Sequence, residues 1–278
     1  MTDQADQAGG IAGTDTLGSS GPNVARVYDY LLGGKDHFAA DRHAAQRLIA
    51  ELPDAATVAK ANRTFLAAAV RQAARDGIAQ YLDIGAGLPT SPSVHECARA
   101  VIPGARVVYV DNDPVAVTHA RALMATGDGV VAIEGDAREP GAILADPGLA
   151  AVLDLTEPVC LLLVSMLHFF TAGEADMIAG TFRQRMVPGS YLVISQGSAG
   201  RGPRDGVQDA YGRETVLTGR PAAEIAAYFD GFDLLPPGLV PVAEWPAAEP
   251  DARLPPRQPA APQANMLAGV GRKRTAGP

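Results

Sequence analysis

The chain has 278 residues, of which 47% are hydrophobic and 19% are charged. This length and composition predict one main domain with a buried core and exclude a wholly disordered chain. The formal net charge of −8 opposes a general polyanion-binding surface, because contacts with phosphates need clustered Lys and Arg. The composition therefore favours a small-molecule partner over nucleic acid.

Two further observations narrow the class of protein. The only cysteines, Cys97 and Cys160, are too few for a disulfide framework and form no CxxC pair, so we expect a reducing cytoplasmic location and no metal site. No apolar run reaches the roughly 18 residues of a membrane-spanning helix, so we expect no membrane partner. Residues 1–21 lack the basic and apolar segments of a signal peptide and are interpreted as a disordered tail.

Residues 22–78 show helical spacing of apolar side chains and no strand pattern. We expect a first helix that ends at Gly33 and Gly34, a second after Asp41 and a third over residues 58–76. These helices form a predicted N-terminal lid.

Residues 79–278 are predicted to form one α/β domain. The expected strands cover residues 80–84, 106–111, 130–134, 159–164 and 191–195, and the helices between them cover residues 92–101, 114–125 and 173–186. A helix at 221–229, strands at 239–245 and 266–270, and a Pro-rich surface loop at 246–262 are expected to follow. Such alternation predicts a doubly wound, mainly parallel sheet, which binds ligands at the carboxyl ends of its strands.

Acidic residues follow the first three strands of this domain. The first strand ends at Asp83 and continues into the turn Gly85-Ala86-Gly87, where a backbone without Cβ atoms can approach a ligand. The second strand ends at Asp111, and Asp136 lies just past the third. A carboxylate in the second position can accept hydrogen bonds from both ribose hydroxyls. Together these acids favour a nucleoside site.

The same loop argues against a dinucleotide. An NAD fingerprint needs a third glycine where this chain has Thr90, and it would not place Pro89 at the start of the phosphate-binding helix. Asp83 would also repel a diphosphate. The pattern favours a cationic or zwitterionic ligand such as S-adenosylmethionine.

Five segments carry a resemblance to a known family. They are residues 26–36 (RVYDYLLGGKD), 83–90 (DIGAGLPT), 108–114 (VYVDNDP), 167–169 (LHF) and 188–192 (PGSYL). The chain resembles the S-adenosyl methyltransferase family, first catalogued as a domain of unknown function. The resemblance implies a Rossmann-like class I methyltransferase fold that binds S-adenosylmethionine, with an unassigned methyl acceptor. Two departures, Ser91-Pro92-Ser93 and His37, affect no implied cofactor contact.

The resemblance also implies which residues bind the cofactor. By position, Asp83, Gly85 and Gly87 would line its methionine part, Asp111 and Asn112 its ribose, and Asp136 and Ala137 its adenine. Ser165, after the fourth strand, and Tyr28, in the lid, complete this predicted set.

His168 lies after the fourth strand, where this fold meets its acceptor. It is a candidate general base, because an unperturbed histidine titrates near neutral pH. The alternative is that His168 hydrogen-bonds to backbone and shapes the pocket. Both interpretations stay open, and no Asn/Asp-Pro-Pro-Tyr/Phe signature of adenine or glutamine methylation is present.

The lid segment at residues 28–42 allows two interpretations. Gly33 and Gly34 could form a hinge or approach the cofactor carboxylate, with Lys35 or Arg63 as its ion partner. Alternatively, the glycines end a helix and Lys35 interacts with its dipole. Three functions remain: a small-molecule methyltransferase, a nucleotide-dependent oxidoreductase, and a module that binds the cofactor without turnover.

Overall fold

The computed structural model describes residues 21–125, 127–199, 217–246, 251–255 and 266–275. Apart from residue 21, the predicted N-terminal tail lies outside the described residues. The strands are β1 (Gln80–Ile84), β2 (Arg106–Asp111), β3 (Val130–Glu134), β4 (Cys160–Val164), β5 (Tyr191–Gly197), β6 (Phe232–Leu234), β7 (Val240–Pro241) and β8 (Met266–Lys273). The α-helices are α1 (Val24–Leu32), α2 (Ala39–Glu51), α3 (Ala55–Arg75), α4 (Val94–Arg99), α5 (Pro114–Leu123), α6 (Pro140–Leu144), α7 (Pro147–Val152), α8 (Ala172–Arg185) and α10 (Ala222–Ala227).

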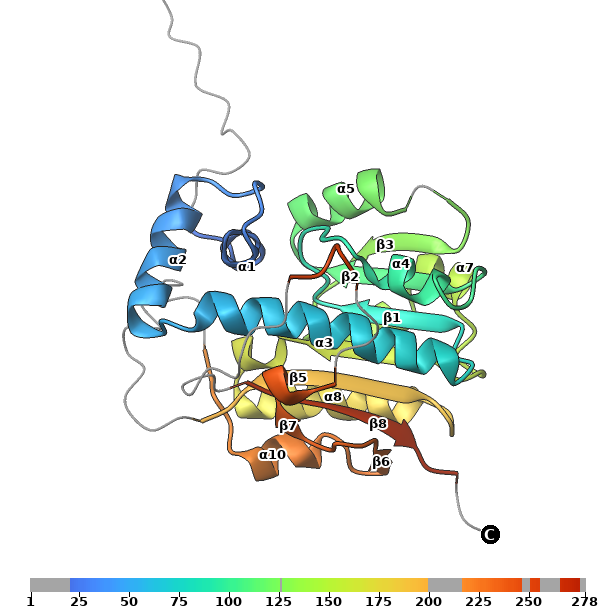
Figure 1. Ribbon diagram of the computed structural model, residues 1–278. Helices are drawn as coiled ribbons and strands as arrows, with labels where there is room; N and C mark the ends of the chain where they lie inside the picture. Colours follow the sequence, from blue (N-terminus) through green and yellow to red (C-terminus); the bar gives the residue numbers. More distant parts are fainter. Residues whose placement is uncertain (1–20, 126, 200–216, 247–250, 256–265, 276–278) are drawn as a thin grey trace, which may run out of the picture.

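These strands form one sheet with the order β3-β2-β1-β4-β5-β8-β6, and β7 pairs with β8 (Figure 1). Strands β1 to β5 are parallel, whereas β8 runs antiparallel to β5, β6 and β7. The order reverses beside β1, which separates the β2–β3 half of the sheet from the β4–β5 half. The doubly wound, mainly parallel fold predicted from the sequence is confirmed, and it places a ligand site at the carboxyl ends of β1 and β4.

Alternating side chains of the sheet pack against two different helical layers. On one face, Tyr81 of β1 belongs to an apolar cluster with α3, α4 and α5. On the other, Leu82 and Ile84 belong to a cluster with α6, α7, α8 and α10. Because strand side chains alternate, Asp83 points to the same face as Tyr81. The carboxylate at the end of β1 therefore faces the layer that contains α3.

The N-terminal helices form a third apolar cluster beyond the carboxyl ends of the strands (Figure 1). Its buried members are Val27, Leu31, Ala44, Ala45, Leu48 and Ala59. Helix α3 contributes Ala59 to this cluster, and its later residues, from Phe65 to Ala74, belong to the sheet core. One continuous helix thus joins the lid to the domain.

The structure departs from the expected elements in the C-terminal third. The strand predicted over residues 239–245 is only two residues of β7, followed by the 3₁₀ helix η2 (Val242–Glu244). Pro241 ends the strand pairing, and Trp245 turns inward to meet the Phe65 ring edge-on, with centroids 5.3 Å apart. Helices α6 and α7 and strand β6 were not predicted. No described helix has the length and apolar character needed to cross a membrane.

Candidate functional site

A cavity of about 560 Å³ lies at the carboxyl ends of β1, β2, β4 and β5 and extends beneath α1 and the first turns of α3. Ten of the predicted site residues line it: Tyr28, Arg63, Asp83, Gly85, Gly87, Asp111, Asn112, Ala137, Ser165 and His168. Four others, Gly33, Gly34, Lys35 and Asp136, are not among its described lining residues.

The glycine turn after β1 is fixed to the end of β2. The backbone N–H groups of Gly85 and Ala86 both donate to the Val110 carbonyl, and the Gly87 N–H donates to Asp111 Oδ2 over 2.7 Å. Both glycines have positive φ angles, 72° and 65°, which side-chain-bearing residues rarely adopt. The turn therefore presents its backbone to the cavity in one defined conformation.

Asp83 is a buried carboxylate that lacks a hydrogen-bond donor among the described residues, and the Asp83 residue is only 6% exposed. Burial raises its pKa to about 7; nearby Arg63 opposes the shift and Asp111 adds to it. An unpartnered buried carboxylate is costly, and a cationic ligand group would relieve that cost. The chemistry of this wall thus fits the ammonium group of S-adenosylmethionine.

Asp111 has a different environment from Asp83. Its Oδ1 accepts the Asp113 N–H over 2.9 Å, and its Oδ2 accepts the Gly87 N–H described above. Burial raises the pKa of Asp111, and these backbone hydrogen bonds oppose that rise. Its carboxylate is oriented at the rim of the glycine turn, beside the exposed Asn112, as a ribose-binding acid requires.

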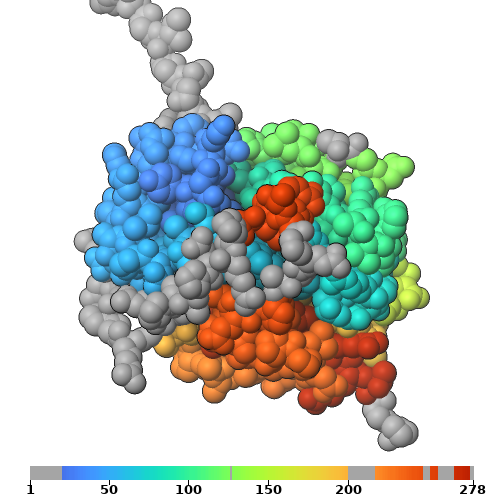
Figure 2. Space-filling model, viewed as in Figure 1, coloured from blue at the N-terminus to red at the C-terminus, as the bar shows by residue number. Residues whose placement is uncertain are grey.

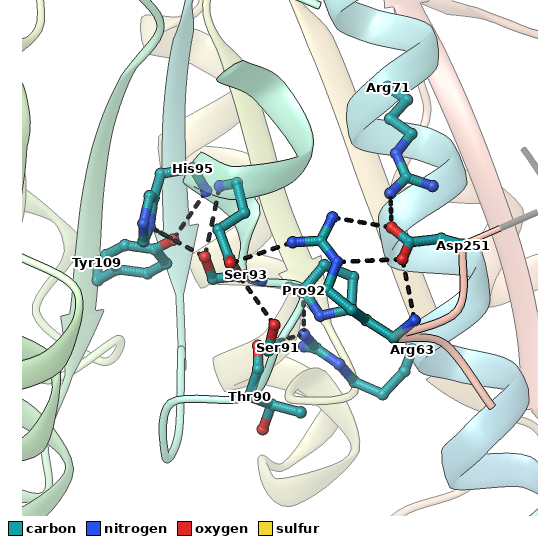
Figure 3. Close-up of polar contacts among 11 residues, drawn as sticks. Arg63, Arg71, Thr90, Ser91, Pro92, Ser93, His95, Tyr109 and Asp251 are labelled. Atoms are coloured by element: carbon teal, nitrogen blue, oxygen red, sulfur yellow. Dashed lines mark hydrogen bonds and ion pairs between the residues drawn. The ribbon is translucent and has the colours of Figure 1, made fainter. Parts of the chain in front are cut away.

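Arg63 connects α3 to the segment that follows the glycine turn (Figure 3). Its Nη2 donates to the carbonyl oxygens of Thr90, at 3.1 Å, and Pro92, at 2.8 Å. The Arg63 Nε is buried without a partner among the described residues. Arg63 therefore fixes the loop while leaving one donor unsatisfied at the cavity wall, which suits a carboxylate ligand.

The lid is tied to the sheet domain by contacts that the sequence did not indicate. Asn23, at the N-cap of α1, donates from Nδ2 to Asp113 Oδ2 over 2.8 Å. Asn23 and Asp113 both line the cavity. Asn23 has the character of a helix cap, but its partner lies 90 residues away, so no local pattern reveals this role.

The glycine pair of the lid ends α1. Gly33 has a φ of 85° and caps the helix, and Gly34 N–H donates to the Asp29 carbonyl over 2.9 Å. A Cβ on Gly34 would overlap the Asp29 carboxylate. Lys35 is exposed. Gly33 and Gly34 therefore end a helix, which is the second of the two interpretations given for the lid segment. Of the two candidate cations, Arg63 lines the cavity and Lys35 does not.

The Asp136 carboxylate does not lie at the cavity, where the sequence predicted a contact with adenine. Its Oδ2 accepts a hydrogen bond from Arg138 Nη2 over 2.5 Å, and this pairing with Arg138 lowers the pKa of Asp136. The residues on either side, Gly135 and Ala137, line the cavity. Backbone at this turn, rather than the Asp136 carboxylate, is thus positioned to meet a ligand.

His168 is buried at the cavity wall in the 3₁₀ helix η1 (Leu167–Phe169). Its Nδ1 accepts the Gly197 N–H over 3.4 Å. A backbone N–H can only donate, so the neutral ring carries its proton on Nε2. A base acting through Nε2 needs the opposite tautomer, so this contact favours the backbone-bonding interpretation.

Buried Arg220 holds the turn that carries His168. Its Nη1 donates to the Leu167 carbonyl and its Nη2 to the Phe170 carbonyl, both over 3.0 Å. These bonds hold the backbone on either side of His168. The arginine is distant in sequence and was not predicted.

Part of the Pro-rich stretch is anchored to the same framework. Asp251 pairs with Arg71 of α3 (Figure 3). Arg253 Nη1 contacts Glu96 Oε1 over 3.1 Å. In Figure 2 residues 251–255 appear in orange-red against the blue-green surface of the chain. Residues 251–255 therefore lie against α3 and α4, the elements on either side of the Arg63 contact.

Comparisons with known proteins agree with this geometry. No curated protein matches the chain. A crystallised candidate methyltransferase from Thermobifida fusca is 38% identical, with a TM-score of 0.82, over 92% of this chain and 96% of that one. A DUF574 family protein from Streptomyces avermitilis is 37% identical, with a TM-score of 0.81, over 91% and 98%.

The family model described as S-adenosyl methyltransferase matches residues 12–274. This match removes the oxidoreductase alternative. The chain belongs to the S-adenosyl methyltransferase family and is an enzyme of that family with S-adenosylmethionine as its cofactor.

Proposed function

We propose that this methyltransferase acts on a small-molecule acceptor enclosed between the lid and the strand ends. The observation that carries the proposal is the cavity itself, whose walls come from both parts of the chain. Its volume of about 560 Å³ falls within the range of small-molecule sites. The Asn23–Asp113 hydrogen bond ties the lid to the sheet domain at this cavity, whereas a polymer substrate would need a long open groove.

Two charged side chains are proposed to hold the methionine part of the cofactor. Asp83 pairs with its ammonium group and Arg63 Nε with its carboxylate, because these are the unsatisfied buried groups of matching charge. Asp111 and Asn112 bind the ribose, and the backbone at Ala137 meets the adenine. The roles proposed from the sequence for Gly33, Gly34, Lys35 and the Asp136 carboxylate are not retained.

The cofactor supplies a methyl group activated by its sulfonium, so the protein mainly has to align the acceptor and exclude water. Lid residues Tyr28 and Leu31 cover the cavity, and Phe169 and Phe170 line the side next to His168. We assign to His168, whose Nδ1 accepts the Gly197 N–H, a role in shaping the cavity wall beside the acceptor. The proton released on methylation then leaves to solvent or to another group.

Calorimetry with S-adenosylhomocysteine and S-adenosylmethionine tests the cofactor site. Asp83→Asn and Arg63→Met should each weaken S-adenosylmethionine binding about ten-fold or more, since each leaves a buried ligand charge unpaired. Lys35→Ala is the matched control, because Lys35 is a cation of the same segment outside the cavity lining. Loss of affinity in Lys35→Ala with unchanged affinity in Arg63→Met would contradict this arrangement.

A second experiment tests the acceptor class. The full chain is incubated with methyl-labelled S-adenosylmethionine and a cell extract divided into metabolites, proteins and nucleic acids. We expect label in the metabolite fraction. Label confined to protein or nucleic acid would refute the small-molecule proposal.

A further inference from the structure

One face of α3 forms an apolar wall of the cavity that contains a single uncharged polar side chain among the described residues. Ala55, Val58, Ala59, Asn62 and Leu66 line the cavity at helical spacing. Asn62 is only 1% exposed. A polar amide fully buried in an apolar stripe requires hydrogen-bond partners.

The hydrogen bonds of Tyr28 determine which way the Asn62 amide points. The Tyr28 hydroxyl lies 3.2 Å from the Ala59 carbonyl, to which it can only donate. Its single proton is thereby used, so it accepts from Asn62 Nδ2, 3.0 Å away. Asn62 Oδ1 is left as a buried acceptor without a partner in the described part of the chain.

Much of the cavity wall around α3 is apolar. Leu31, Leu48 and Leu52 line the lid side of the cavity, and Phe169 and Met266 belong to its sheet side. A buried acceptor left unpaired in such surroundings costs about 1–3 kcal/mol, and a ligand that donates to it recovers that cost. Arg63 does not fill this role, because its Nη2 is held by Thr90 and Pro92 and its Nε has no partner among the described residues, Asn62 Oδ1 included.

The charges around the cavity indicate which ligands it disfavours. Among its described lining residues the acidic side chains are Asp29, Asp54, Asp83, Asp111, Asp113 and Glu174, and the basic ones are Arg63 and Arg138. The basic pair is engaged, Arg63 with loop carbonyls and Arg138 with Asp136. An anionic acceptor would meet net repulsion in this part of the cavity.

We propose that Asn62 Oδ1 recognises the methyl acceptor, and that the acceptor is a non-anionic, largely apolar small molecule that carries an N–H or O–H donor. This inference rests on the proposed function and adds the class of acceptor to it. Tyr28 acts as a positioning residue, because its hydroxyl accepts from Asn62 Nδ2 and leaves Oδ1 as the unused acceptor of the amide.

The test uses ligand-observed NMR on the full chain saturated with S-adenosylhomocysteine. Three probes share one ring system: 2-naphthol is a donor, 2-methoxynaphthalene lacks the donor, and 2-naphthoate is an anion. We expect 2-naphthol to bind about ten-fold more tightly than its methyl ether, as one buried hydrogen bond allows, and more tightly than the carboxylate.

Asn62→Leu should abolish the preference for the donor while leaving S-adenosylhomocysteine affinity within about two-fold, because Leu keeps the branched outline of Asn without its acceptor. Asn62→Ala removes the same oxygen without added bulk, and it takes the place of Asn62→Leu in the test if that variant does not fold. Asp54→Asn is the matched control, since it alters another lining side chain of the same region and should keep the preference.

Equal binding of 2-naphthol and its ether to the unaltered chain would overturn the proposal, as would a preference that persists in Asn62→Leu and Asn62→Ala. A large loss of S-adenosylhomocysteine affinity in these variants would assign Oδ1 to the cofactor instead and also overturn it. Cofactor binding is measured before any probe is added. A chain that fails at that stage refutes the proposed function itself, which separates the two failures.

Discussion

Replacing Asp83 by Asn should stabilise the ligand-free protein at neutral and alkaline pH. Asp83 has a pKa of about 7 in the folded chain, against an ordinary value of 3.8, and the largest cause is burial. A difference of about three pKa units corresponds to about 4 kcal/mol, which is the cost of keeping this carboxylate ionised in the fold. Asn has the same shape without the charge, so Asp83→Asn removes up to that amount.

The pH range of the effect follows from the two pKa values. Below pH 4 the carboxyl is protonated in both the folded and unfolded chains, and Asp83 imposes no ionisation cost. Between about pH 4 and 7 the folded state binds more protons than the unfolded state, so stability falls as pH rises. Above pH 7 both states are ionised and the penalty stays constant.

Urea unfolding of the ligand-free chain at intervals from pH 4 to 8 measures this effect. The free energy of unfolding of Asp83→Asn minus that of the unaltered chain should increase from near zero at pH 4 to a plateau above pH 7. Taking the difference cancels the other titrating groups. A difference that does not change with pH would show that Asp83 titrates near its ordinary value, and would refute the dehydrated carboxylate on which the ammonium assignment depends.

The same titration predicts how cofactor affinity depends on pH. An ammonium ligand pairs with ionised Asp83, so affinity for S-adenosylmethionine should rise between pH 5 and 7 and release close to one proton per ligand bound near pH 5.5. Calorimetry in buffers of different ionisation enthalpy counts that proton. Asp83→Asn should bind weakly at every pH without this proton release, so the variant gains stability and loses function.

Three other changes test the remaining contacts. Asn23→Ala removes both the helix cap and the bond to Asp113, and should lower stability by about 1 kcal/mol in urea unfolding and speed S-adenosylhomocysteine release in stopped-flow. Asp251→Asn leaves the guanidinium of Arg71, whose side chain is 9% exposed, without its counterion, and should lower the Tm of the chain by several degrees in calorimetry. His168→Gln should retain label transfer to the metabolite fraction better than His168→Ala, because Gln keeps more of the side-chain volume at the cavity wall; equal loss would argue against this packing role.

The central strands could be predicted because strands buried on both faces have a recognisable, mostly apolar sequence. β1, β2 and β3 begin and end where the apolar, β-branched runs do, since both of their faces are covered by helices. Strands β6 and β7 contain only three and two residues, and their pairing with β8 depends on contacts across the fold. Helix α7 was missed although Asp146 and Pro147 form a recognisable helix start.

The site residues also divide into those that the sequence could predict and those that it could not. Asp83 and Asp111 follow directly from the rule that acids at parallel strand ends meet at one edge of the sheet. Asn62 looks like any polar residue of a long helix. Its importance arises only because Tyr28, which donates its own proton to the Ala59 carbonyl, accepts from Asn62 Nδ2. Lys35 was attractive by charge, but the helix cap at Gly33 leaves it on the exposed surface.

The position of Asn62 directly before Arg63 constrains how the lid can move. Consecutive residues of a helix project about 100° apart, so α3 can direct Arg63 to the glycine loop and Asn62 to the lid from a single turn. The two side chains belong to one unbroken 21-residue helix that continues into the sheet core. Opening of α1 and α2 would therefore break the Tyr28 contact with Asn62 but leave the Arg63 contact in place. The contact of Arg63 with the glycine loop therefore depends on α3 and the sheet domain, whereas the contact of Asn62 depends also on α1.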